Sequence, residues 1–129
     1  MNMEMYNMAT YLIIPAAMLV LGIFLGNKPP KWGNRFIGYR TKRSKKTEAT
    51  WEFSQKIFAK VSVNVGFILL LGGLIVTAVG MHLNVEMQRL LGWGTLIAYL
   101  VGLFYSFIKV ENALNLHFDK NGKMKKKSK

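Results

Sequence analysis

The sequence predicts an all-α integral membrane protein with three transmembrane helices and a cytoplasmic amphipathic segment between helices 1 and 2. Its 129 residues are 51% hydrophobic, yet they carry a net charge of +12. Apolar and charged residues are segregated, because residues 5–27, 61–85 and 90–108 contain no Lys, Arg, Asp or Glu. Each stretch approaches or exceeds the length of about 20 apolar residues that crosses a bilayer. This pattern excludes a soluble globular enzyme and a disordered basic protein.

The hydropathy places the spans at about residues 6–25, 61–81 and 90–108 of one membrane domain that comprises residues 1–129. The first span differs from a secretory signal, because Glu4 is the only charged residue before it and no small-residue cleavage site follows it. We therefore expect a retained helix.

The basic residues predict the orientation of the chain in the membrane. Ten of the 18 Lys and Arg lie in the loop at residues 27–60, seven lie in the tail at residues 109–129, and the last is Arg89. Three spans place this loop and this tail on one side, which the positive-inside rule makes cytoplasmic. The N-terminus is then expected outside and the C-terminus in the cytoplasm.

Small residues predict how the helices pack. The third span has Gly94, Ala98, Gly102 and Ser106 at a spacing of four, which lets another helix approach closely. The second span also contains several glycines, so we expect an antiparallel hairpin of these two helices with their glycine faces together. A homo-oligomer formed through one of the faces is the alternative.

The loop between the first two spans has a definite pattern. Pro29 and Pro30 should end the first helix, and Gly38 indicates a turn with positive φ. A helix is expected from Thr47, a suitable N-cap, with Glu48 in its first turn. The apolar residues on this amphipathic stretch are Trp51, Phe53, Ile57, Phe58, Val61 and Val65. Such a stretch, running into the second span, is typical of a membrane interface.

A motif in this loop resembles the signature of the SdpI family of bacterial membrane proteins. The order of residues is N-x-x-x-G-Y-R-T-x-x-S, followed after seven residues by Trp, in an amphipathic stretch that ends in a membrane helix. The residues that match it are Asn34, Gly38, Tyr39, Arg40, Thr41, Ser44 and Trp51. The place of the motif between spans one and two is also similar.

The resemblance implies a protein of the bacterial cytoplasmic membrane that gives immunity to a secreted antimicrobial peptide or toxin. In some family members it also implies signalling, with a cytoplasmic repressor held at the membrane. The alternative function is that of an accessory subunit in a larger membrane transporter or envelope complex.

Among the motif residues, Arg40 is the one we expect to carry function. Its planar guanidinium can hold a phosphate or a carboxylate through two hydrogen bonds. The alternative is a structural role, in which Arg40 locks the loop onto the helices by bonding exposed carbonyls. The many basic residues are also expected to attract anionic lipids on the cytoplasmic side.

The sequence offers no visible machinery for catalysis, for a cofactor or for a metal site. The sequence does not place a nucleophile, a base and an acid, such as Ser, His and Asp, on one face of any predicted helix. His82 and His117 are expected on opposite sides of the membrane, and the chain contains no cysteine. Residues 119–122 resemble the start of a calcium loop but lack the later ligands, so we expect an Asn-Gly turn. We expect no specific binding of nucleic acid.

Overall fold

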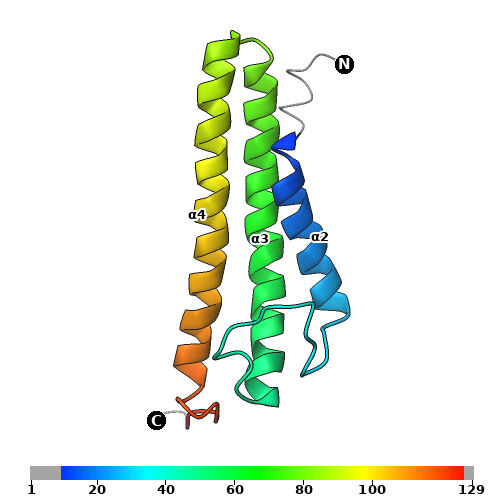
Figure 1. Cartoon of the computed structure of the whole chain (residues 1–129), viewed down its shortest axis with the longest axis vertical. Helices are drawn as coiled ribbons and strands as arrows, with labels where there is room; N and C mark the ends of the chain where they lie inside the picture. The colour runs from blue at the N-terminus through cyan, green and yellow to red at the C-terminus, as the bar shows by residue number, and fades with distance from the viewer. Residues whose placement is uncertain (1–9, 127–129) are drawn as a thin grey trace.

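The computed structural model describes residues 10–126, which form three helices: α2 (Ile13–Asn27), α3 (Glu48–Gly80) and α4 (Val85–His117). Figure 1 shows α3 and α4 as a long antiparallel pair, with the shorter α2 beside α3. Within residues 10–126, β structure is limited to one isolated bridge between Phe118 and Met124. The all-α prediction is confirmed.

Two of the helices are long and apolar enough to cross a membrane. Each of α3 and α4 has 33 residues, which corresponds to about 50 Å at 1.5 Å per residue. This exceeds the hydrocarbon thickness of about 30 Å, so part of each helix extends beyond an apolar layer. The third helix, α2, is apolar but has only 15 residues. The predicted first span began at residue 6, and residues 6–9 lie outside the described residues.

The helix ends follow from local sequence. The apolar helix α2 ends before Pro29 and Pro30, as predicted. At the start of α3, the Thr50 backbone N–H donates to the Thr47 Oγ1 at 3.1 Å, and the Thr47 N–H donates to the Thr50 Oγ1 at 2.9 Å. Two of the free N–H groups at this end are thereby satisfied. The predicted start of the helix is confirmed.

Both long helices extend beyond the predicted apolar spans. The amphipathic stretch and the second span form one continuous helix, α3. The predicted third span stops at residue 108, where charged residues begin, whereas α4 continues to His117. It continues because Val110 and Leu114, one turn apart, are both fully buried against the loop and α3. Hydropathy therefore underestimates the length of this helix.

Among the helical glycines, those that lie closest to the backbone of another helix are in α2 and α3. A Cβ added to Gly66 of α3 would lie 2.9 Å from the backbone nitrogen of Leu19, and one added to Gly22 of α2 would lie 2.9 Å from the carbonyl oxygen of Ala59. Backbone atoms cannot move aside as a flexible side chain can. These two glycines therefore set the distance between α2 and α3.

The small residues of α4 are divided between two environments. Gly102 contacts the Leu69 side chain of α3, and the buried Ser106 donates a hydrogen bond to the Gly102 carbonyl at 2.9 Å. Gly94 has no heavy atom within 4 Å of an added Cβ, and Ala98 is exposed. Of the two glycines in the expected stripe, Gly102 thus lies against α3 and Gly94 does not.

We predict that Gly66→Ala destabilises the packing of α2 on α3 by about 1 to 3 kcal/mol, because the added methyl meets backbone. The matched control is Gly72→Ala in the same helix, where an added Cβ meets no atom within 4 Å. It should change stability by less than about 0.5 kcal/mol. Thermal unfolding of the detergent-purified chain measures both, and equal effects of the two variants would contradict the assignment.

Candidate functional site: the motif loop

The buried core of the protein lies where the loop at residues 28–47, here called the motif loop, meets α3 and α4. Figure 1 shows this loop, in cyan, crossing α3 toward α4 before it returns to the start of α3. Its Tyr39 packs with Val110, Leu114 and Phe118, the end of α4 and the residue that follows it. Side chains of α3 pack against this cluster: Phe53, Ile57 and Phe58. The motif loop therefore joins both long helices.

The Gln55 side chain holds the backbone of the loop. Its Oε1 accepts a hydrogen bond from the Tyr39 N–H at 2.8 Å, and its Nε2 donates to the Tyr39 carbonyl oxygen at 2.8 Å. Gln55 is fully buried. A buried amide left without these partners would cost about 1 to 3 kcal/mol, so the pairing strongly favours this one position of the loop.

Gly38 is required by this pairing. Its φ is +111°, in the region that favours glycine. An added Cβ would lie 2.7 Å from the Gln55 Oε1 and 2.8 Å from the Pro30 Cγ. The Trp51 Nε1 donates to the Pro30 carbonyl at 2.8 Å, which places Pro30 beside Gly38. Gly38, Pro30, Trp51 and Gln55 thus contact one another as one interlocked unit.

Tyr39 links the loop to α4. Its hydroxyl donates to the Glu111 Oε1 at 2.6 Å, and its ring lies 5.2 Å from that of Phe58 and 6.0 Å from that of Phe107. Burial raises the pKa of the Tyr39 hydroxyl well above its usual range, and the hydrogen bond and negative charge of Glu111 raise it further. The hydroxyl therefore stays protonated and remains a donor to Glu111.

Thr41 and Ser44 form a reciprocal pair that turns the chain into α3. The Thr41 N–H donates to the Ser44 Oγ at 2.8 Å, and the Ser44 N–H donates to the Thr41 Oγ1 at 3.2 Å. Ser44 is fully buried, and its carbonyl accepts a hydrogen bond from the Thr50 Oγ1 at 3.0 Å. The motif thus runs directly into the N-cap of α3.

Asn34 and Arg40 shape the outer part of the loop. The Asn34 Oδ1 accepts hydrogen bonds from the backbone N–H groups of Phe36 at 2.9 Å and Ile37 at 3.1 Å. The Arg40 Nη1 donates to the Arg35 carbonyl within the same loop. Arg40 is the only one of the seven motif residues with an exposed side chain. It thus bonds a loop carbonyl while its side chain remains exposed.

The residues after α4 fold back onto the motif loop. The Thr47 Oγ1 donates to the Gly122 carbonyl at 3.0 Å. The Asp119 carboxylate accepts from the N–H groups of Lys123 and Asn121, each at 2.9 Å. The hydrogen bond from the Lys123 N–H is the largest cause of the lowered pKa of Asp119, and the bond from the Asn121 N–H lowers this pKa further. The turn predicted from the Asn-Gly pair is therefore present.

Within residues 10–126, no group of three His, Asp or Glu is placed so that it could hold a metal ion.

Three partners of the motif were missing from the predicted site: Gln55, Thr50 and Glu111. Gln55 lies one turn after Trp51 on the same face of α3, and a polar residue in line with a buried aromatic was a usable signal. Thr50 lies three residues after the predicted N-cap. Glu111 comes after the apolar span, so hydropathy assigned it to the tail.

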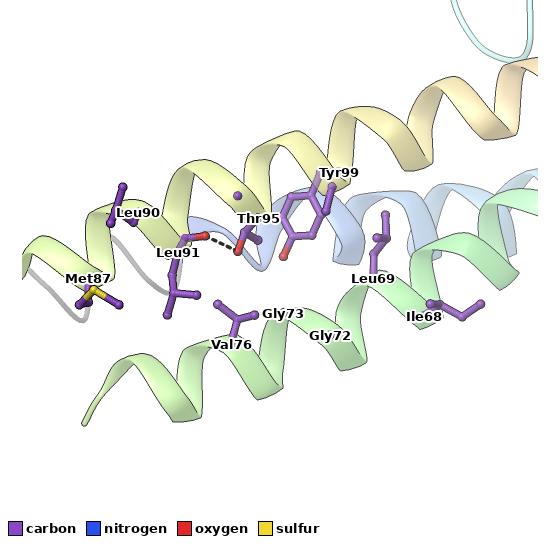
Figure 2. Close-up of a pocket in the computed structure, with 12 residues that line it drawn as sticks. Ile68, Leu69, Gly72, Gly73, Val76, Met87, Leu90, Leu91, Thr95 and Tyr99 are labelled. Carbon is purple, nitrogen blue, oxygen red and sulfur yellow. Dashed lines mark hydrogen bonds between the residues drawn. The ribbon is translucent and has the colours of Figure 1, made fainter. Parts of the chain in front are cut away.

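A groove lies between α3 and α4, away from the motif loop. Figure 2 shows Thr95 and Tyr99 of α4 pointing toward α3 across this groove, whose volume is ≈ 520 Å³. Gly72 of α3 and Gly94 of α4 line it. The Tyr99 hydroxyl is buried without a hydrogen-bond partner in the described part of the chain, close to Gly73. The lining is almost entirely apolar.

We predict that Gly38→Ala destabilises the protein by about 2 to 5 kcal/mol, because it combines backbone strain with overlap on Gln55 and Pro30. Gly33→Ala is the matched control, since Gly33 also has a positive φ, of +92°, but its added Cβ meets nothing within 4 Å. It should cost only about 1 kcal/mol. Tryptic cleavage of the basic loop and the free energy of unfolding measure both, and equal losses would contradict the interlocked unit.

We predict that part of the stability is lost above about pH 10, where the unfolded chain releases the Tyr39 proton and the folded chain keeps it. Because the folded pKa is raised, this contribution is complete below pH 10 and decreases as the pH rises. Tyr39→Phe should remove this part of the alkaline decline, whereas Tyr105→Phe, at an exposed position of α4, should leave it. Unfolding free energies across alkaline pH test this, and an unchanged slope in Tyr39→Phe would refute it.

Comparison with known proteins agrees with the motif. A family model described as the SdpI/YfhL protein family matches residues 31–110, which cover most of the motif loop, all of α3 and α4 up to Val110. No match was found among curated proteins or among solved structures. Because the family model covers more than half of the chain, this protein belongs to the SdpI/YfhL family.

Proposed function

We propose that this membrane protein crosses the bilayer three times, with its N-terminus outside and its motif loop and tail in the cytoplasm. Family membership and the two long apolar helices indicate a membrane protein. The contacts between Thr47 and Gly122 and between Tyr39 and Glu111 support one common side for the loop and the tail. The concentration of basic residues in these two segments supports the cytoplasmic side.

We further propose that the protein protects its host against a secreted antimicrobial peptide or toxin that acts on the membrane. The observation that carries this proposal is family membership over residues 31–110, together with the motif. The motif residues are built into the structure as a unit: Gly38, Tyr39 and Ser44 are interlocked with α3 and α4. A loop held in one position on two helices is suited to binding another molecule, and the proposed role requires no chemical reaction.

Within this unit, Arg40 is the proposed contact residue. Six of the motif residues are half-buried or buried and serve the loop itself, whereas Arg40 is exposed. An arginine fork binds a carboxylate or phosphate in a planar, two-bonded geometry that lysine cannot reproduce. The exposed side chain supports a role in recognition, whereas the hydrogen bond from Arg40 to the Arg35 carbonyl is the kind of contact that the alternative, locking role needs.

We predict that the chain, expressed alone in sensitive bacteria, raises survival against membrane-active peptides secreted by related bacteria. Arg40→Lys should lose most of this protection at normal protein level, because the charge stays while the fork is lost. Arg35→Lys is the matched control, since it makes the same change at an exposed position of the same loop and keeps the carbonyl that Arg40 bonds. Survival counts and membrane protein levels are measured together.

Other results separate the alternatives. Full protection by an accumulating Arg40→Lys protein would refute the role of Arg40. Degradation of this variant would instead assign Arg40 to loop structure. A wild-type chain that is unstable without a partner and never protects would contradict immunity and favour the accessory subunit. Co-purification of a DNA-binding repressor, without protection, would favour signalling.

A further inference from the structure

A basic hollow lies between the motif loop, α4 and the tail. Its volume is ≈ 600 Å³. Three of its cationic residues come from the loop, Lys42, Arg43 and Lys46, and the fourth, Lys120, comes from the tail. The loop and the tail are held together by the hydrogen bond from Thr47 to Gly122. The tertiary structure therefore gathers cations that are up to 78 positions apart in the chain.

The positive charge of this hollow is not balanced by its own lining. Glu111 is the one carboxylate among the described lining residues, and its Oε1 accepts the hydrogen bond of the Tyr39 hydroxyl. The four cations and this carboxylate leave a net charge of +3. Like charges held close together repel one another, and an anion bound between them removes that repulsion. Arg43, half-buried, offers a planar fork, and the lysines offer point charges.

The hollow also has an apolar side. Phe107 of α4 lines it, and the Phe107 ring lies 6.4 Å from that of Phe104, one turn nearer the middle of α4. Phe104 is 65% exposed. Exposed aromatic surface of α4 thus lies next to the cationic residues of the loop and the tail, and a phosphate with an attached acyl chain fits this arrangement.

We propose that this hollow binds the phosphate headgroup of an anionic phospholipid, with an acyl chain along Phe107 and Phe104. Thr41 and Asn115, which also line it, supply a hydroxyl and an amide for the remaining phosphate oxygens. The site differs from a general attraction of basic segments to lipid, because hydrogen bonds fix the loop and the tail on its two sides. The proposal rests on the membrane location proposed above.

The test compares lipid binding by the full chain, purified in detergent and studied by native mass spectrometry. The probes are phosphatidylglycerol, phosphatidylcholine and glycerol 3-phosphate, which has the phosphate without acyl chains. The pocket variant Arg43→Gln/Lys46→Gln/Lys120→Gln is set against Lys45→Gln/Lys56→Gln/Lys60→Gln. The control removes the same charge from exposed positions outside the hollow.

The wild-type chain should retain phosphatidylglycerol in preference to the two other probes. The pocket variant should bind phosphatidylglycerol at least about tenfold more weakly and the control variant within about twofold of wild type. Equal weakening in both variants would overturn the site, because it is the result of general surface attraction. Equal binding of glycerol 3-phosphate would overturn the lipid assignment in favour of a soluble anion.

Two further measurements keep the outcome clear. If the triple variant unfolds, Lys42→Glu/Lys120→Glu replaces it, because both of these side chains are exposed; unchanged lipid binding by this variant overturns the proposal. A reporter enzyme that is active only outside the cell, fused after Lys129, tests the orientation separately. Detergent has no inside or outside, so a wrong orientation would defeat the proposed topology and leave the binding result intact.

Discussion

The Gln55 side chain and the Tyr39 backbone exchange two hydrogen bonds of 2.8 Å, and the positions of the motif loop and of the Tyr39 side chain follow from them. These bonds fix the motif loop against α3 in the way that a neighbouring strand would fix it. Because Gln55 is fully buried, loss of either bond leaves a polar group without water. The positive φ of Gly38 and the aim of the Tyr39 ring toward α4 both follow from this position of the backbone.

The contacts of Tyr39 and Thr47 connect the motif loop to α4 and to the tail. The Tyr39 hydroxyl reaches Glu111, and the ring packs on Val110 and Leu114, so α4 stays helical beyond its apolar part. The tail then returns over the N-cap of α3 through the bond between Thr47 and Gly122. The basic hollow exists because these contacts join the loop to the tail and place the cationic residues of both around one space.

The apolar ends of the helices are organised by different forces. In a bilayer, helices associate through close packing, since lipid is as apolar as the side chains. Gly22 and Gly66 provide it between α2 and α3. Between α3 and α4, Gly72 and Gly94 face open space in the groove, and close contacts are made by Gly73 with Tyr99 and by Gly102 with Leu69. The motif loop therefore contributes to the alignment of helices whose apolar parts pack unevenly.

The amino-acid sequence was sufficient to predict the helical class, the family, the start of α3 at Thr47 and the positive φ of Gly38. These depend on local chemistry: charge segregation, a capping side chain and the freedom of glycine. The folded chain was needed to show that Gln55 and Glu111 complete the motif, that α4 continues to His117 and that Lys120 lies with the loop cations. Those features depend on contacts between segments distant in the chain, as from Tyr39 to Glu111, and neither hydropathy nor spacing records such contacts.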